Sequence, residues 1–310
     1  MNYDELRAEL VKKYQLKEFK EALNIAKTME NNFPEKRSKT SFNVALLQAH
    51  LNQFDNCIET LQKAVKDGIY WPKDILDYYP SSEELKKASR FDEFQKNNLE
   101  LLSEAQKKVK RQVFIYEPEN RDTSKEIMIL IALHWGNSTA KEYEGFWKET
   151  VLKNSIVLVL PQSSQIGGYE TFTWMDIEKG CQEITQTVQE LEQKYKIKGI
   201  VIGGSSIGAK LTMELVKRKF SSKILGFILS MPWQTPVQEF VDNLDLEYYK
   251  NTKCFIITDT ADPGYNDHKQ LFVKLQEINF PTKIFESEGF GHVIPDNFDE
   301  ILQSIITEIV

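Results

Sequence analysis

The sequence predicts an all-α helical-hairpin domain followed by an α/β domain in which a mostly parallel sheet is flanked by helices. Apolar residues recur at helical spacing through residues 1–110, and no strand-like run occurs there. From residue 111 onward, short apolar runs alternate with helical stretches, which is typical of a parallel sheet covered on both faces. The 310 residues, 41% of them hydrophobic, are enough for two globular cores. We therefore expect one domain over residues 1–110 and a second over 111–310.

The first domain is expected to consist of helical hairpins. Apolar faces with helical spacing are found in residues 3–14, 19–29, 42–49, 58–65 and 91–108. The motif Leu16-Lys17-Glu18-Phe19 recurs 35 residues later as Leu51-Asn52-Gln53-Phe54. Helix-turn-helix pairs with about this period resemble tetratricopeptide units. The resemblance implies a groove for a peptide or protein partner, and the alternative is a helical surface that packs on the second domain or self-associates.

The second domain is expected to alternate strands with helices. The strands are expected at residues 111–116, 127–133, 156–160, 199–202, 224–229, 254–257 and 282–285. The helices are expected at about residues 140–152, 176–195, 207–219, 266–278 and 297–309. Most of the strand runs are continuously apolar, which predicts strands that are buried on both faces of the sheet.

The stretch Gly204-Ser205-Ser206-Ile207-Gly208 carries the strongest functional signal. It follows an apolar, β-branched run and precedes a helical face, so Gly-x-Ser-x-Gly stands at a strand-to-helix turn, as in a nucleophile elbow. Only Ser206 has glycine two residues before it and two residues after it. The pattern therefore predicts Ser206 as a nucleophile and the backbone N–H of Ile207 as one donor of an oxyanion hole.

A serine nucleophile needs a base, and the chain has four histidines to supply it. His50 and His268 lie within predicted helices and are interpreted as ordinary helix-surface residues. His134 ends a predicted buried strand and is expected to fix the loop that follows. His292 lies in a glycine-containing loop between the last strand and the last helix, at the sheet edge where Ser206 is expected. We therefore predict His292 as the base.

The acid that orients the base is expected after the strand at 254–257. Asp262 lies in the turn ahead of Pro263-Gly264, and Asp259 lies nearer the end of the strand. We prefer Asp262 and keep Asp259 as the alternative, because aspartates before Pro-Gly often bond only to their own turn. The resulting order of serine, acid and histidine is that of the α/β-hydrolase fold.

The second oxyanion donor is expected in the loop after the strand at 127–133. The backbone N–H of either Trp135 or Gly136 would serve, and the sequence does not choose between them. Aromatic residues in loops near the expected site predict an apolar or aromatic substrate pocket. The residues assigned to this pocket are Trp174, Trp233 and Phe290.

From His134 to its end, the chain resembles α/β hydrolases, and in particular the phospholipase/carboxylesterase group of small serine esterases. The matching motifs are His134-Trp135-Gly136, Leu160-Pro161-Gln162-Ser163-Ser164-Gln165, Trp174-Met175-Asp176, Gly204-Ser205-Ser206-Ile207-Gly208, Thr260-Ala261-Asp262-Pro263 and Gly291-His292-Val293-Ile294-Pro295. The resemblance implies that Ser206, Asp262 and His292 form a triad that hydrolyses esters or thioesters. Two positions depart from the family, which usually has glycine in place of Trp135 and often glutamine in place of Ile207.

These observations predict a serine carboxylesterase that acts on a small-molecule ester through an acyl-enzyme. A thioesterase or peptidase would use the same triad, and a non-catalytic protein that binds a partner through its helical domain is the alternative of another class. The glycine turn lacks the spacing of nucleotide-binding loops and no metal-ligand cluster occurs, so we expect no cofactor and no metal.

Composition narrows the partners and the location. The net charge of −7 and the absence of a basic run argue against nucleic acid and against an anionic membrane surface as partners. No apolar run reaches the length of a membrane span, and the first residues lack a signal-peptide pattern. Three widely spaced cysteines indicate a reducing compartment, so we expect a cytoplasmic protein.

Overall fold

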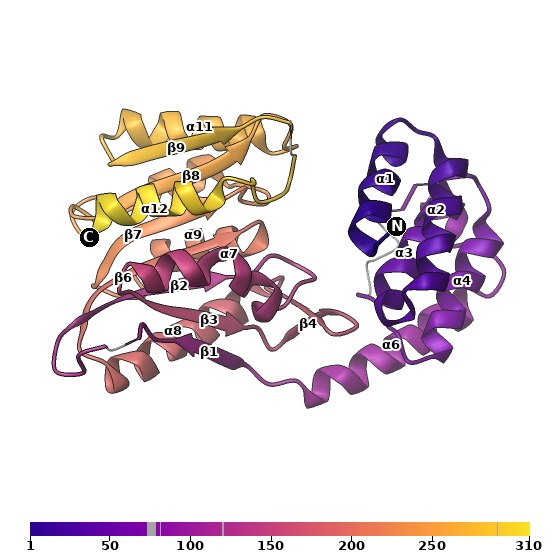
Figure 1. Cartoon of the computed structure of the whole chain (residues 1–310), viewed down its shortest axis with the longest axis horizontal. Helices are drawn as coiled ribbons and strands as arrows, with labels where there is room; N and C mark the ends of the chain where they lie inside the picture. Colours follow the sequence, from indigo (N-terminus) through magenta and orange to yellow (C-terminus); the bar gives the residue numbers. More distant parts are fainter. Residues whose placement is uncertain (73–78, 81, 120, 290) are drawn as a thin grey trace. The chain divides into compact units, whose positions relative to one another are not determined.

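The chain forms two compact units. The computed structural model of the protein describes residues 1–72, 79–80, 82–119, 121–289 and 291–310. The helical unit contains Met1–Lys108 together with Ile166–Tyr169, and the α/β unit contains Val109–Gln165 and Glu170–Val310 (Figure 1). The chain therefore returns to the helical unit for one short segment in the middle of the α/β unit. Nothing in the sequence pattern of residues 166–169 indicated this return.

The helical unit is built from antiparallel helices that pack on their neighbours in the chain. Its elements are α1 (Tyr3–Gln15), α2 (Phe19–Asn32), the 3-10 turn η1 (Pro34–Lys36), α3 (Arg37–His50), α4 (Phe54–Lys66), α5 (Ser82–Leu85) and α6 (Phe91–Lys108). Asn2 caps α1 in a capping box with Glu5, in which each side chain accepts from the other residue's backbone N–H. The repeated tetrapeptide forms equivalent turns, because Lys17 and Asn52 both adopt left-handed φ angles, of 59° and 57°.

The α/β unit contains a seven-stranded sheet in the order β1-β3-β2-β6-β7-β8-β9. Its strands are β1 (Gln112–Tyr116), β2 (Ile127–Leu133), β3 (Val157–Gln162), β6 (Ile197–Ser205), β7 (Ile224–Ser230), β8 (Lys253–Asp259) and β9 (Thr282–Ser287). Strand β1 runs antiparallel to β3, and all other neighbours are parallel. The predicted mostly parallel sheet is confirmed. A separate two-stranded sheet of β4 (Gln165–Gly168) and β5 (Thr171–Thr173) was not predicted.

Helices cover both faces of the large sheet. They are α7 (Ala140–Lys153), α8 (Ile177–Lys194), α9 (Ile207–Lys217), the short α10 (Val237–Asp242), α11 (Tyr265–Glu277) and α12 (Phe298–Ile309). Helices α8, α9, α10 and α11 share one apolar core with the sheet, and α7 and α12, nearer the viewer in Figure 1, share the other. Successive strand residues alternate between the two cores, since Ile129 and Ile131 belong to the first and Leu130 and Ala132 to the second.

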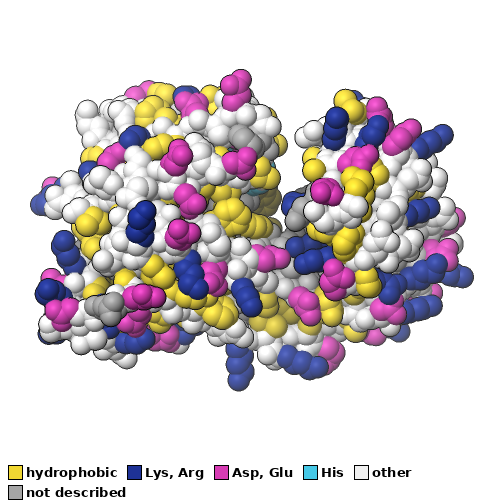
Figure 2. Space-filling model, viewed as in Figure 1, with side chains coloured by type: hydrophobic (Ala, Val, Ile, Leu, Met, Phe, Trp, Pro, Cys, Tyr) yellow, Lys and Arg dark blue, Asp and Glu magenta, His cyan; other side chains and the backbone are white. Residues whose placement is uncertain are grey.

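The surface carries charges of both signs. Figure 2 shows Lys and Arg side chains interspersed with Asp and Glu side chains over the visible face of the α/β unit. Several of these charges pair along helices, as Lys148 does with Glu144 at 2.6 Å in α7. Within the described ranges, no helix is both long enough and apolar enough to cross a bilayer.

Candidate active site

Ser206 lies in a strained turn between β6 and α9. Its φ of 55° and ψ of −119° lie outside the regions that a residue with a side chain usually adopts. Three backbone hydrogen bonds hold this conformation. The Ser206 N–H donates to the Ser230 carbonyl at 2.9 Å, and the Ser206 carbonyl accepts from Lys210 at 3.1 Å and from Trp233 at 3.2 Å. The hydroxyl is therefore presented from a backbone that is fixed on both sides.

The flanking glycines are required by close backbone contacts. A Cβ on Gly204 would lie 2.5 Å from the carbonyl carbon of Gly208, so the strand and the helix meet directly at this turn. A Cβ on Gly208 would lie 2.4 Å from the carbonyl oxygen of Leu133, at the end of β2. Both neighbours are backbone atoms that have little freedom to move. The two glycines therefore let the turn and the end of β2 approach each other.

His292 connects Ser206 to Asp262. Its Nε2 lies 2.9 Å from Ser206 Oγ, and its Nδ1 lies 2.6 Å from Asp262 Oδ2. A carboxylate only accepts, so the Nδ1–H donates to Asp262, and the neutral Nε2 accepts the serine O–H. The Asp262 side chain is 1% exposed and the His292 side chain 38%. The imidazole can therefore meet a substrate, while its orienting carboxylate is shielded from water.

Asp259 has a different set of partners, which separates the two candidate acids. Its Oδ1 accepts the backbone N–H of Ala261 and of Gly291, each at 2.8 Å, and its Oδ2 accepts the hydroxyl of Ser287 at 2.8 Å. The side chain is completely buried at the end of β8. Asp259 thus ties the turn that carries Asp262 to the loop that carries His292.

The loop after β2 is held by a buried neutral histidine. His134 is completely buried, and its Nδ1–H donates to the carbonyl of Trp135 at 2.8 Å. Burial lowers the pKa of His134 to about 4, so the ring carries no charge near neutral pH. The indole N–H of Trp174 donates to the His134 carbonyl at 3.0 Å. These bonds position the backbone of the loop beside the nucleophile elbow.

The loop after β2 lies against the first residue of α9. A Cβ on Gly136 would lie 3.5 Å from Cγ2 of Ile207, so the loop rests on this side chain. As the first residue of a helix, Ile207 has a backbone N–H outside the intrahelical series. The ring of Trp135 points to α7, where it packs edge-on against Tyr143 and Phe146. The expected oxyanion donors, Ile207 and Trp135 or Gly136, therefore come from two adjacent segments.

The three aromatic residues assigned to the pocket have different positions. Trp174 is completely buried and supports the His134 loop through its indole N–H, so its assignment to the pocket was wrong. The ring belongs to the apolar core that α8 shares with the sheet, and a Cβ on Gly180 of α8 would lie 3.4 Å from it. Trp233 is half-buried, and its backbone N–H bonds to the Ser206 carbonyl. Phe290 lies outside the described residues.

The interpretation of His268 as a helix-surface residue was also wrong. The side chain is completely buried, with Nδ1 2.7 Å from the hydroxyl of Thr258 and Nε2 3.0 Å from the carbonyl of Pro232. A carbonyl only accepts, so the proton lies on Nε2, and Nδ1 accepts from Thr258. The signal was present in the sequence, because His268 precedes the buried Leu271 and Leu275 at helical spacing. His50 is half-buried in the helical unit, stacked on another ring.

Tyr143 is a further buried polar residue that sequence reasoning missed. Its hydroxyl lies 2.9 Å from the hydroxyl of Ser205, the residue before Ser206, and the side chain is completely buried. The pKa of Tyr143 is raised well above its usual value by this burial. A tyrosine on an apolar helical face gives no sequence signal that separates such a contact from ordinary core packing.

The three cysteine thiols of the chain are poorly placed to act as nucleophiles. Cys57, Cys181 and Cys254 are buried, and none of them forms a disulfide. Burial raises the pKa of Cys57 and of Cys181 to about 12, which keeps both thiols protonated. Among the residues that the structure describes, no group of three or more His, Cys, Asp or Glu side chains is arranged to hold a metal ion.

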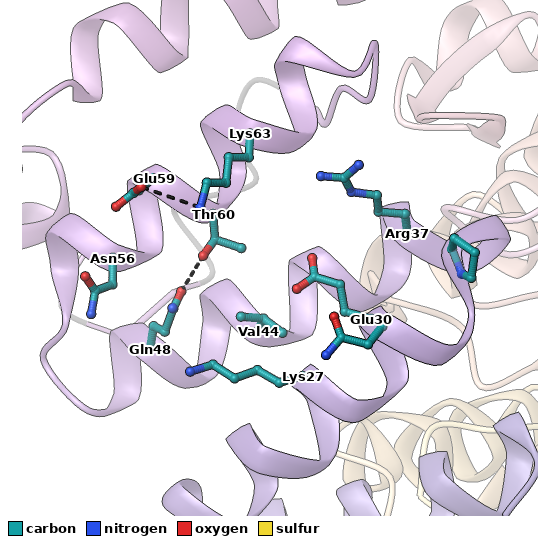
Figure 3. A pocket seen from close by; sticks show the side chains of 11 residues that line it. Lys27, Glu30, Arg37, Val44, Gln48, Asn56, Glu59, Thr60 and Lys63 are labelled. Atoms are coloured by element: carbon teal, nitrogen blue, oxygen red, sulfur yellow. Dashed lines mark hydrogen bonds and ion pairs between the residues drawn. The ribbon is translucent and has the colours of Figure 1, made fainter.

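A separate groove of about 650 Å³ lies in the helical unit. Its walls come from α2, η1, α3 and α4 (Figure 3). The charged residues that line the groove are Lys27, Arg37, Lys63, Glu30 and Glu59. Among them, Lys63 pairs with Glu59 at 3.5 Å. The groove is thus polar and carries charges of both signs, which distinguishes it from an apolar ligand cavity.

The fold recurs in solved structures, although no family model and no curated protein matches the sequence. An uncharacterized protein from Bacillus cereus ATCC 10987 is 23% identical with a TM-score of 0.57, and the match covers 100% of this chain and 99% of that chain. Acyl-protein thioesterase 2 from Zea mays is 13% identical with a TM-score of 0.51, over 64% of this chain and 98% of that chain. At these identities the likeness shows the fold, which is the α/β-hydrolase fold, preceded in the sequence by N-terminal helices.

Proposed function

We propose that the protein is a serine hydrolase that cleaves carboxylic esters with Ser206 as nucleophile, His292 as general base and acid, and Asp262 as the orienting acid. The observation that carries the proposal is the position of His292 Nε2 at 2.9 Å from Ser206 Oγ and of Nδ1 at 2.6 Å from Asp262 Oδ2. Both distances lie within hydrogen-bond reach, which general-base activation of a serine requires.

The reaction proceeds in two steps through an acyl-enzyme. Ser206 Oγ attacks the ester carbonyl carbon while its proton moves to His292 Nε2, and Asp262 stabilises the imidazolium. The imidazolium then protonates the departing alcohol oxygen as the bond to the acyl group breaks. In the second step His292 removes a proton from water and the water oxygen attacks the acyl carbon. The bond from that carbon to Ser206 Oγ then breaks as His292 returns the proton to Oγ, which releases the carboxylic acid.

Negative charge on the carbonyl oxygen is stabilised by backbone donors. The N–H of Ile207 and the N–H of Trp135 or Gly136 supply the two hydrogen bonds that an oxyanion needs. His134 supports this arrangement because it is neutral and holds the loop by its bond to the Trp135 carbonyl. A donor on a rigid loop stabilises charge with little reorganisation during the reaction.

Covalent labelling tests the proposal directly. A fluorophosphonate probe is expected to label the wild-type protein at Ser206, and Ser206→Ala is expected to lose both the label and the turnover of para-nitrophenyl acetate. Residual turnover in the variant should be lower by at least about a thousandfold, because the nucleophile of the acyl-enzyme route is gone. A folded wild-type protein that neither takes the label nor hydrolyses any ester would refute the proposal.

The same residues would serve a thioesterase or a peptidase. The likeness to the Zea mays acyl-protein thioesterase supports including thioesters among the substrates to be tested. One acyl group offered as an oxygen ester, a thioester and an amide separates the three activities by their kcat/KM values.

The three buried cysteines, none in a disulfide, support a reducing location such as the cytoplasm.

A second candidate function is partner binding by the helical unit. It is favoured by the polar groove between α2, α3 and α4, whose charged side chains suit an extended polar peptide segment (Figure 3). The whole chain is expected to retain peptides from a random peptide array, and the double charge reversal Lys27→Glu with Lys63→Glu is expected to change the set that it retains. If the wild type and the variant retain identical peptides, the groove is excluded as the peptide-binding site. A dimer of the whole chain in analytical sedimentation would instead favour self-association.

A further inference from the structure

We propose that Lys210 and Trp233 form a recognition subsite for a carboxylate on the ester substrate. The inference rests on the proposed function, because it assigns a substrate class to the same site. Its starting point is the carbonyl of Ser206, which accepts the backbone N–H of both Lys210, at 3.1 Å, and Trp233, at 3.2 Å. The backbones of both residues are therefore one hydrogen bond away from Ser206, Lys210 through the first helical bond of α9 and Trp233 through a bond from the loop after β7.

The two side chains meet beside this anchor. The Nζ of Lys210 lies over the indole ring of Trp233, 5.2 Å from the ring centroid, which is within range for a cation–π contact. Its other polar contact is a long hydrogen bond of 3.4 Å to the side-chain oxygen of Gln234. Within the described part of the chain, no carboxylate lies within ion-pair distance of this Nζ. Its two printed contacts are thus with neutral groups, and it has no ion-pair partner among the described residues.

The loop that carries Trp233 is rigid. Met231 and Gln234 adopt left-handed φ angles of 44° and 49°, which are strained for residues with side chains. The Met231 N–H donates to the carbonyl of Ile257 at 2.8 Å, and the buried His268 donates to the carbonyl of Pro232 at 3.0 Å. Strained backbone of this kind clusters at functional sites, where the surrounding structure holds it in place. The indole is therefore a preorganised platform for the ammonium group.

A preorganised cation on a residue whose backbone is bonded to Ser206 favours a substrate with an anion at a matching distance from its scissile bond. A carboxylate would form a charge-assisted hydrogen bond with Nζ, while the apolar part of the substrate would lie along the indole. The net charge of the chain is −7, so the protein as a whole repels anions and a local cation has to offset that repulsion. The subsite thus selects carboxylate-bearing esters over neutral esters of the same size.

Matched ester pairs test this selection. The acyl side is probed with the mono-para-nitrophenyl esters of adipic and suberic acid against neutral para-nitrophenyl esters of equal chain length. The alcohol side is probed with meta-acetoxybenzoate against meta-acetoxybenzamide. In the wild type, kcat/KM is expected to favour the anionic member of at least one pair. In Lys210→Met this ratio should fall about tenfold, mainly through KM, which is the size of effect expected for one charge-assisted hydrogen bond.

Three controls separate recognition from a general effect. Lys210→Arg keeps the positive charge and is expected to retain most of the preference. Lys198→Met removes the same charge from an exposed position at the opposite end of β6 and is expected to leave the ratio unchanged. Raising the ionic strength should lower the wild-type ratio, because salt screens a partly exposed ion pair.

The outcomes distinguish the two proposals. The carboxylate subsite is refuted if the wild type hydrolyses neutral and anionic esters equally. It is also refuted if Lys210→Met lowers kcat/KM for both members of each pair by the same factor. In both cases the proposed hydrolase activity still stands. If the wild-type protein takes no fluorophosphonate label and cleaves no ester, both proposals fail.

Discussion

Asp259 and Asp262 lie three residues apart at the end of β8, and their carboxylates perform separate tasks. Asp262 accepts from the imidazole of His292, whereas Asp259 accepts two backbone N–H groups and one hydroxyl. The contact of Asp262 bears on the proton state of His292, the proposed base. The contacts of Asp259 fix the positions of the two loops. Sequence spacing alone left both aspartates as candidates, because each follows the same strand and precedes the same turn.

The corresponding asparagine variants are expected to fail in different ways. Asp262→Asn should lower kcat by at least a hundredfold and change the pH–rate profile, because an amide does not hold His292 in the tautomer that accepts the serine proton. Asp259→Asn should lower the free energy of unfolding by about 2 kcal/mol, because one buried acceptor becomes a donor facing donors. The pH–rate profile of Asp259→Asn should keep the wild-type shape. Urea unfolding and pH–rate measurements on both variants check this, and exchanged phenotypes would reverse the assignment.

His134 is expected to make the protein sensitive to acid. Its pKa is about 4 in the folded state, against 6.5 for an unperturbed histidine, so the unfolded chain takes up this proton first. The stabilisation is therefore complete above pH 6.5 and is lost as the pH falls towards 4, by at most about 3 kcal/mol.

A comparison with His134→Gln isolates this contribution. The wild-type free energy of unfolding should fall more steeply than that of His134→Gln between pH 6.5 and pH 4.5, in urea titrations at each pH. Parallel pH dependences in the two proteins would show that the ring is accessible to protons in the folded state.

At the scale of elements, the strands of the large sheet were predictable and the small elements were not. Strands such as β2 and β3 are buried along their whole length, so their sequences are continuously apolar and stand out from the helices. Helix α10 has six residues, and β5 has three, which is too short for a hydrophobic period to emerge. The elbow was predictable because its geometry demands glycine at two exact spacings from the serine. Trp174 was misassigned because a loop sequence does not reveal which way a ring points.

The elbow predicts a contrast between two helical glycines. Gly208→Ala should lower the free energy of unfolding by about 3 kcal/mol, because its Cβ would lie 2.4 Å from a backbone carbonyl oxygen that belongs to β2. Gly145→Ala, on the exposed face of α7, meets no atom within 4 Å and should raise stability by about 0.5–1 kcal/mol through helix propensity. Chemical denaturation of both variants measures the contrast, and equal effects would contradict the close approach of β2 to α9.

At the scale of the whole molecule, the chain passes between the two units at more places than the connection from α6 to β1. The segment Ile166–Tyr169 follows β3 in sequence but belongs to the helical unit. There the N–H of Ile166 donates to the side chain of Gln106 at 3.1 Å, and the N–H of Tyr169 donates to the carbonyl of Tyr70 at 2.9 Å. Sequence patterns placed a boundary near residue 110 because composition and period change there, but the four residues 166–169, most of them in the short strand β4, are too few to show a period of their own.

This linkage predicts how a fragment of residues 109–310 will behave. The fragment contains every residue of the proposed triad, so its soluble fraction should take a fluorophosphonate label. It lacks the partners of the 166–169 segment, which leaves the ring of Tyr169 without its contact to Tyr70 and unpairs two backbone donors. Exposed apolar surface of this kind promotes association. We expect the fragment to aggregate more than the whole chain in light scattering, and Tyr169→Ser to reduce that aggregation in the fragment. Equal aggregation with and without the substitution would show that the segment does not need the helical unit.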